Sequence, residues 1–131
     1  MTNRKRYKVI IIDDNDISRM LLRNILRSGG YEIIGEAPNA TKGIEMIQTK
    51  KPDIVCLDNM MPDMNGLEML LEIRPLFPNT LIVMITGNSD NETIQTALQR
   101  GVDGYVTKPY SIGTVLDTME HTLNKKYPTN P

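Results

Sequence analysis

Five short runs of apolar residues divide the chain, and a longer segment whose apolar residues have helical spacing follows each run. The runs occupy residues 8–12, 31–35, 54–58, 81–85 and 104–106. The run at 81–85 (LIVMI) is apolar on both faces, which is typical of strands inside a parallel sheet. This alternation predicts an α/β fold, in which a five-stranded parallel sheet carries helices on both faces.

The segments between the runs also carry signals for the ends of helices. We expect helices at residues 17–28, 40–49, 66–74 and 111–125, and one more that ends at Arg100. Polar residues at 14–15 and 88–89 are expected to cap the first and fourth helices. In the first helix, Ile17, Leu21 and Ile25 form an apolar stripe. Met20, Leu22 and Leu26 widen it. Pro75 is expected to end the third helix because proline has no amide hydrogen to donate.

The length and composition are those of one globular domain: 131 residues, 40% hydrophobic and 24% charged. We predict this domain at residues 1–126, with its core at 8–124, followed by a tail or the start of a linker at 127–131. Whether the chain is free-standing or the N-terminal part of a longer protein stays open.

A net charge of −1 creates no overall field that would recruit nucleic acid or an acidic membrane. No apolar run approaches the roughly 20 residues that span a bilayer. The single cysteine, Cys56, cannot form an internal disulfide, which fits a reducing compartment. We therefore predict a cytoplasmic protein that binds neither nucleic acid nor membrane directly.

Charged and hydroxyl side chains follow four of the predicted strands. Asp13 and Asp14 come after the first strand, Asp58 ends the third, and Thr86 and Lys108 follow the fourth and fifth. Because parallel strands end at the same edge of a sheet, these side chains are expected to meet there, where open α/β sheets bind ligands.

Three neighbouring carboxylates repel one another, by about 4 kcal/mol for each pair at about 4 Å and an effective dielectric near 20. A hard divalent cation such as Mg²⁺ would relieve this repulsion. Lys108 and Thr86 suit phosphate oxygens, which leaves Asp58 as a nucleophile for phosphoryl transfer. The alternative is an acidic edge that Lys108 neutralises and that performs no chemistry.

Other kinds of site lack their required residues. The turn after the first strand, Asp13 to Asp16, has neither the glycine pattern of a P-loop nor that of a dinucleotide-binding fold. Paired acids also do not suit a flavin phosphate. The only histidine, His121, lies on the last predicted helix, away from this edge, so a Ser-His-Asp hydrolase is not expected.

The motifs VIIIDD, LDNMMPDMNG, MITG and GYVTKPY occur here in the order and spacing of a response-regulator receiver domain of two-component signalling. The chain resembles that family from Lys8 to about Asn124. The resemblance implies a parallel sheet of strand order 2-1-3-4-5. It also implies a signalling switch rather than a turnover enzyme.

By this resemblance, Asp58 is the phospho-acceptor, modified by a histidine kinase or a phosphotransfer protein. Asp13, Asp14, Asp58 and the backbone carbonyl of Met60 would bind Mg²⁺, with Mn²⁺ as a substitute. Lys108 would pair with the phosphoryl group.

The resemblance further implies that Thr86 and Tyr105 move together as a switch and that the Lys108–Pro109 peptide is cis. The fourth helix, fifth strand and fifth helix would form the responsive face, toward a downstream target or output domain that the sequence does not identify. Dimerisation through that face stays open. Two alternatives also stay open: a metal-dependent phosphohydrolase, and a pseudo-receiver that only dimerises.

Overall fold

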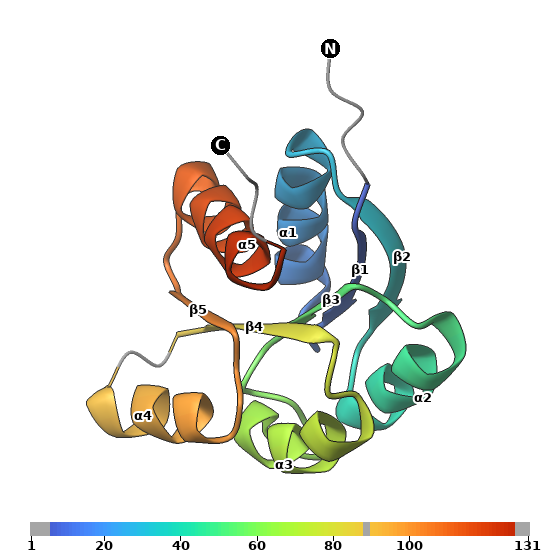
Figure 1. Cartoon of the computed structure of the whole chain (residues 1–131), viewed down its shortest axis with the longest axis vertical. Coiled ribbons are helices and arrows are strands. Elements are labelled where there is room, and N and C mark those ends of the chain that lie inside the picture. Colours follow the sequence, from blue (N-terminus) through green and yellow to red (C-terminus); the bar gives the residue numbers. More distant parts are fainter. Residues whose placement is uncertain (1–5, 88–89, 128–131) are drawn as a thin grey trace.

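The structure is a computed structural model that describes residues 6–87 and 90–127. Within these ranges, five parallel strands form one sheet of order β2-β1-β3-β4-β5 (Figure 1). The strands are β1 (Lys8–Ile12), β2 (Glu32–Ala37), β3 (Ile54–Leu57), β4 (Leu81–Thr86) and β5 (Gly104–Thr107). The helices are α1 (Asp16–Ser28), α2 (Ala40–Lys50), α3 (Gly66–Leu76), α4 (Asn91–Gln99) and α5 (Ile112–Lys126). The predicted α/β fold and strand order are confirmed.

Two layers of helices enclose the sheet: α1 and α5 cover one face, and α2, α3 and α4 cover the other (Figure 1). Alternate residues of each central strand enter the two resulting cores, as the strand period of two requires. In β3, for example, Ile54 and Cys56 pack toward α1 and α5, whereas Val55 and Leu57 pack on the opposite side. The central strands are therefore buried on both faces, as their uniformly apolar sequences predicted.

The pairing of β1 with β3 determines where the polar strand ends emerge. Ile12 pairs with Leu57, so the residues that follow, Asp13 and Asp58, leave neighbouring strands side by side. In the sheet, β2 lies on one side of β1 and β3 lies on the other. The chain therefore reverses its direction of travel across the sheet after β2, and the carboxyl ends of β1 and β3 form the topological switch point, where open α/β sheets bind ligands.

The ends of some elements differ from the prediction. β2 runs to Ala37, although it lies at the edge of the sheet as expected. Pro75 lies inside α3, so the prediction that it ends this helix is wrong. Pro75 has no amide hydrogen to donate, but the helix continues past it until the Phe77 amide donates to the Ile73 carbonyl at 2.8 Å.

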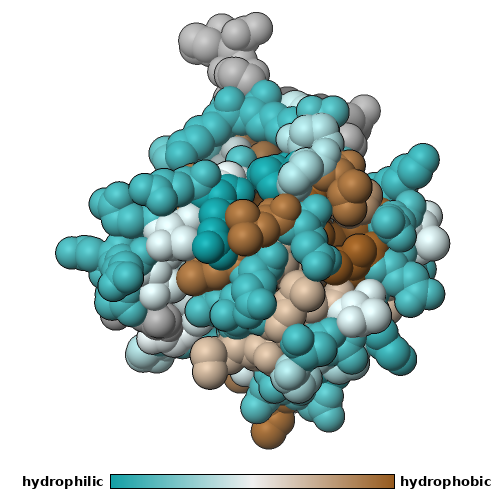
Figure 2. Space-filling model, turned by 90° about the horizontal axis from the view of Figure 1, so that it is seen from below, coloured by the Kyte–Doolittle hydropathy of each residue, from teal (hydrophilic) through white to brown (hydrophobic). Residues whose placement is uncertain are grey.

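Only part of the apolar stripe predicted for α1 packs on the sheet, along Leu22, Ile25 and Leu26. Leu22 and Leu26 are buried, whereas Ile17 and Leu21 are 66% and 51% exposed. Helical spacing identified an amphipathic helix, but α1 has more apolar residues than its contact with the sheet and α5 can cover. Helices α3 and α4 likewise expose leucines, and Figure 2 shows apolar areas among hydrophilic ones on their side of the molecule.

Helix α4 begins at Asn91, one residue after the start that a cap at residue 89 would give. Asp90 is its N-cap and accepts a hydrogen bond from the Thr93 amide at 2.7 Å. The predicted caps, Asn88 and Ser89, lie outside the described residues. At the end of the chain, the Tyr127 ring stacks on that of Tyr7, with centroids 5.9 Å apart, and residues 128–131 lie outside the described part.

Among the described residues, none of the helices has both the length and the apolar character needed to cross a membrane. Cys56 is buried, and burial raises the pKa of its thiol to about 12. The thiol is therefore a small core group rather than a reactive one.

Close packing of α2 on the sheet depends on Gly43. A methyl group built there would lie 2.5 Å from Cδ1 and 3.0 Å from Cγ1 of Ile12. We expect Gly43→Val to lower the free energy of unfolding by about 1–3 kcal/mol, because the added atoms overpack this core. Urea unfolding followed by circular dichroism measures the change.

Gly113→Val is the matched control, since Gly113 is also helical but its nearest neighbour to an added methyl is 3.9 Å away. That variant should stay within about 0.5 kcal/mol of the wild type. Equal losses at the two positions would contradict the packing argument.

Candidate functional site

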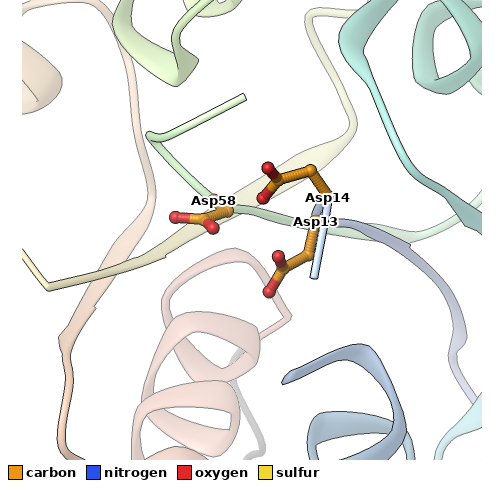
Figure 3. Close-up of side chains that lie close together, drawn as sticks. All are labelled: Asp13, Asp14 and Asp58. Atoms are coloured by element: carbon orange, nitrogen blue, oxygen red, sulfur yellow. The ribbon is translucent and has the colours of Figure 1, made fainter. Parts of the chain in front are cut away.

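Three carboxylates meet at the carboxyl edge of β1 and β3. Asp13, Asp14 and Asp58 each bring an oxygen atom within 4.8 Å of the others, and the three side chains surround a common space (Figure 3). Asp13 and Asp58 are only 4% and 7% exposed, whereas Asp14 is exposed. At this separation and an effective dielectric near 20, each pair of ionised groups repels by about 3–4 kcal/mol.

Lys108 provides positive charge beside this acidic cluster. Its Nζ lies 3.7 Å from Oδ2 of Asp13 and 3.7 Å from Oδ2 of Asp58. The Lys108–Pro109 peptide is cis, as the resemblance implied. Tyr110, which follows Pro109, packs against the core, and its pKa is raised by burial and by the negative charges of Asp13 and Asp58.

Burial dominates the acidity of Asp58 and raises its pKa from 3.8 to about 6. The positive charge of Lys108 and the Met60 amide, which donates to Oδ1 at 3.3 Å, lower the pKa, while the negative charge of Asp13 raises it. Near neutral pH Asp58 is therefore mostly ionised, in a setting where additional positive charge would stabilise it.

The backbone around Asp13 is held by bonds that the sequence analysis did not identify. Arg19 donates to the Asp13 carbonyl at 2.6 Å, and its guanidinium also contacts Asp16 and Glu36. The Asn15 amide donates to Oδ1 of Asp13 at 2.9 Å. The available signal was an arginine one turn into the helix after the paired acids, but helical spacing alone does not show that its side chain turns back toward the strand.

The loop after β3 is fixed to the beginning of α3. The Gly66 amide donates to the Asn59 carbonyl at 2.9 Å, and the Leu67 amide donates to Oδ1 of Asn59 at 3.2 Å. Asn65 and Glu68 form a capping box at the same helix end. A methyl group on Gly66 would lie 2.9 Å from the Asp58 carbonyl oxygen, so this close approach requires glycine.

Asp63, in the same loop, was also missed. Its carboxylate accepts hydrogen bonds from the Ala40 amide at 3.0 Å and the Thr41 amide at 2.9 Å, both at the beginning of α2. The Thr41 hydroxyl donates to it as well, at 2.8 Å. No local pattern could identify this contact, because its partners lie 22 and 23 residues earlier in the chain.

The other predicted site residues occupy different positions. Thr86 is fully buried at the end of β4, where its carbonyl accepts from the Lys108 amide at 2.8 Å. Tyr105 lies within β5, half-buried against the core on the side of α2, α3 and α4, and does not belong to the acidic cluster. The Met60 side chain is 69% exposed. His121 is exposed on α5.

The acidic cluster suits a metal ion, because its donor atoms are all carboxylate oxygens, which hard divalent cations prefer. A bound cation would also offset the repulsion between the three acids. The arrangement therefore combines a cluster that could hold a metal, a buried carboxylate and an adjacent ammonium group at one edge of the sheet.

Comparison with known proteins gives a consistent result. Residues 9–120 match the family described as the response regulator receiver domain. The chemotaxis protein CheY of Thermotoga maritima is 33% identical over 112 residues, covering 86% of this chain and 93% of that protein. CheY of Halobacterium salinarum is 35% identical over 116 residues, covering 88% and 96%.

Solved structures agree in fold. A CheY-like receiver domain protein from Methanospirillum hungatei superposes with a TM-score of 0.86 at 26% identity, covering 94% of this chain and 98% of that one. The CheX–CheY–BeF3–Mg complex from Borrelia burgdorferi gives a TM-score of 0.85 at 25% identity, covering 94% and 90%. With the family match extending over nearly the whole described fold, the chain belongs to the response regulator receiver domain family.

Proposed function

We propose that this receiver domain is a phosphorylation switch that accepts a phosphoryl group on Asp58 in a Mg²⁺-dependent reaction. The observation that carries the proposal is the position of the Asp58 carboxylate, which is buried between two further acids and 3.7 Å from the Lys108 ammonium. This surrounding favours chemistry that brings a cation and an anionic group to the same carboxylate.

In the proposed reaction, an oxygen of ionised Asp58 attacks the phosphorus of the donor. A new O–P bond forms, and the bond from phosphorus to the donor's leaving group breaks, with the electron pair departing on that group. Lys108 would bind a phosphoryl oxygen and offset its charge, and the 3.7 Å separation of its Nζ from both Asp13 and Asp58 supports this role.

Asp13, Asp14 and Asp58, together with the Met60 carbonyl, are the groups that would hold Mg²⁺, and Mn²⁺ would substitute for it. A bound Mg²⁺ would neutralise charge on the carboxylates and on the transferred phosphoryl oxygens. The two buried acids, Asp13 and Asp58, are fixed by strand pairing, whereas Asp14 is exposed and free to adjust.

The proposed switch runs through Thr86 and Tyr105. Thr86 ends β4 next to the strand that leads into Asp58, so its hydroxyl would turn toward a phosphoryl oxygen. Tyr105, on the neighbouring strand, would turn inward with it and alter the face made by α4, β5 and α5. The phosphoryl group acts by binding one of two conformations better than the other.

A histidine kinase or a phosphotransfer protein would donate the group, and an output domain or separate target would read the changed face. We assign the receiver domain to residues 1–126, with its core at 8–124, and a tail or linker from residue 127. It would act in the cytoplasm as a switch, rather than as an enzyme that turns over an external substrate.

Replacement of the acceptor tests the central claim. With acetyl phosphate and Mg²⁺, wild-type protein should gain one phosphoryl group, and Asp58→Asn should gain none, because an amide is a poor nucleophile. Intact-mass spectrometry measures the product. Asp53→Asn is the matched control, since Asp53 lies at the opposite end of β3, where it accepts from the Lys8 amide; that variant should be labelled like wild type.

The alternatives predict different products. Labelling of Asp58→Asn to the wild-type level would contradict the assignment. Steady release of phosphate from phosphomonoesters would favour a phosphohydrolase, and a wild-type protein that neither binds Mg²⁺ nor takes up phosphate would favour a pseudo-receiver.

Metal binding is expected to depend on the exposed acid of the cluster. We expect Asp14→Asn to weaken Mg²⁺ binding by about tenfold or more, because it removes one of three charged oxygen ligands. Isothermal titration calorimetry measures the dissociation constant. Asp117→Asn, at an exposed acid on α5, should leave Mg²⁺ affinity unchanged, and equal affinities in all three proteins would contradict the site.

The raised pKa of Asp58 also predicts how metal-free stability varies with pH. The folded state holds the proton up to about pH 6, whereas an ordinary aspartate loses it near 3.8, so stability falls as pH rises between these values. In EDTA, Asp58→Asn should exceed the wild type by about 1–2 kcal/mol at pH 7.5, after allowance for screening.

This advantage of Asp58→Asn should narrow as the pH falls from about 6 to about 4, because the wild-type carboxyl group then becomes neutral as well. Urea unfolding at a series of pH values measures it. A constant difference across this range would show that Asp58 is not the group responsible.

A further inference from the structure

The loop that carries the acceptor is attached to a second helix as well as to α3. The Asp63 carboxylate accepts from the amides of Ala40 and Thr41 and from the Thr41 hydroxyl, at 2.8–3.0 Å. Partial desolvation acts to raise the pKa of Asp63, but these bonds outweigh it and lower the pKa to about 2. The carboxylate is therefore ionised while it bridges the loop and α2.

Helix α2 also has a local cap. Asn39 accepts from the Lys42 amide at 2.9 Å, as an N-cap residue normally does. Asp63 binds the two preceding amides from a distant loop. The two side chains thus share the first turn of α2, but only Asp63 connects that turn to the loop after β3.

Asp63 is close in the chain to the groups that would hold the metal. It follows Met60 by three residues, and Pro62 between them has a fixed φ and no amide hydrogen. Met61 packs against the core on the side of α2 and α3. On the other side of Met60, Asn59 is bound to the beginning of α3. Met60 therefore lies between two anchored points of the loop, and Asp63 makes the second.

We propose that Asp63 is a positioning residue, which holds the loop after β3 on α2 so that Met60 stays beside the Asp58 carboxylate. There the Met60 amide donates to Asp58 at 3.3 Å, and the Met60 carbonyl would be available to the metal. This inference rests on the proposed Mg²⁺-dependent phosphorylation of Asp58. Asp63 touches neither the metal nor the phosphoryl group and acts through the backbone. Its loss gives the loop freedom that metal binding must then remove, at a cost in affinity.

An effect of the Asp63 bonds on Mg²⁺ affinity requires an equal effect of Mg²⁺ on the stability of those bonds. If the bonds from Asp63 to α2 favour the loop conformation that binds Mg²⁺, then Mg²⁺ favours those bonds. In the wild type, Mg²⁺ is therefore expected to slow hydrogen exchange at the amides of Ala40 and Thr41. A cap that only stabilised α2 would not respond to the metal.

The test compares wild type, Asp63→Asn and Asn39→Ala. Asparagine keeps the size of Asp63 but presents an NH₂ group toward amide donors, so it cannot accept all of the present bonds. Asn39→Ala weakens the same helix end without altering the loop. Calorimetric Mg²⁺ affinity and the rate of labelling by acetyl phosphate are measured at a temperature where circular dichroism shows all three proteins folded.

We expect Asp63→Asn to bind Mg²⁺ about tenfold more weakly, at the low end of the effect of outer-shell partners, and to be labelled more slowly at subsaturating Mg²⁺. Asn39→Ala should match the wild type in both measurements. If Asp63→Asn does not fold, Thr41→Val decides, because it removes only the hydroxyl bond and is expected to weaken Mg²⁺ binding about threefold.

Wild-type affinity in Asp63→Asn, or an equal loss in Asn39→Ala, would overturn the positioning role while leaving the proposed function intact. If Asp63→Asn does not fold, wild-type Mg²⁺ affinity in Thr41→Val would likewise overturn the positioning role. If the wild type itself binds no Mg²⁺ and takes up no phosphoryl group, the proposed function fails first, which is a distinguishable result.

Discussion

Repulsion between the carboxylates of Asp13, Asp14 and Asp58 is the interaction on which the remaining features of this edge depend. Free side chains would move apart into water. Here Asp13 and Asp58 cannot do so, because the pairing of Ile12 with Leu57 delivers them from adjacent buried strands. The sheet thus stores an unfavourable charge arrangement, which Lys108 offsets in part and a cation could offset further.

Holding such a cluster requires a rigid surrounding, and long-range hydrogen bonds supply it. Arg19 reaches back from α1 to the Asp13 carbonyl, Asn59 binds the beginning of α3, and Asp63 binds the beginning of α2. Three helices therefore fix the two segments that carry the acids. The proposed switch would give these contacts a purpose, because a switch must return to one defined resting geometry.

Much of the fold was predictable from local patterns. Apolar runs located the five strands, and proline, glycine and capping residues located most helix ends to within two residues. The failures have a common cause. A proline near a helix end can stop the helix or lie inside its last turn, and an apolar residue on a helix can be buried or exposed. Contacts with other elements decide between these outcomes for Pro75, Ile17 and Leu21.

The sequence by itself determined that acids, a hydroxyl and an ammonium would follow the strands, since parallel strands all end at one edge. That edge holds Asp13, Asp14, Asp58 and Lys108 together as expected. Only the tertiary structure decided which residues support them. Arg19 and Asp63 act across turns and between helices, and Asp63 meets α2 from 22 residues away. Local periodicity contains no information on such contacts, because they arise from how the layers pack.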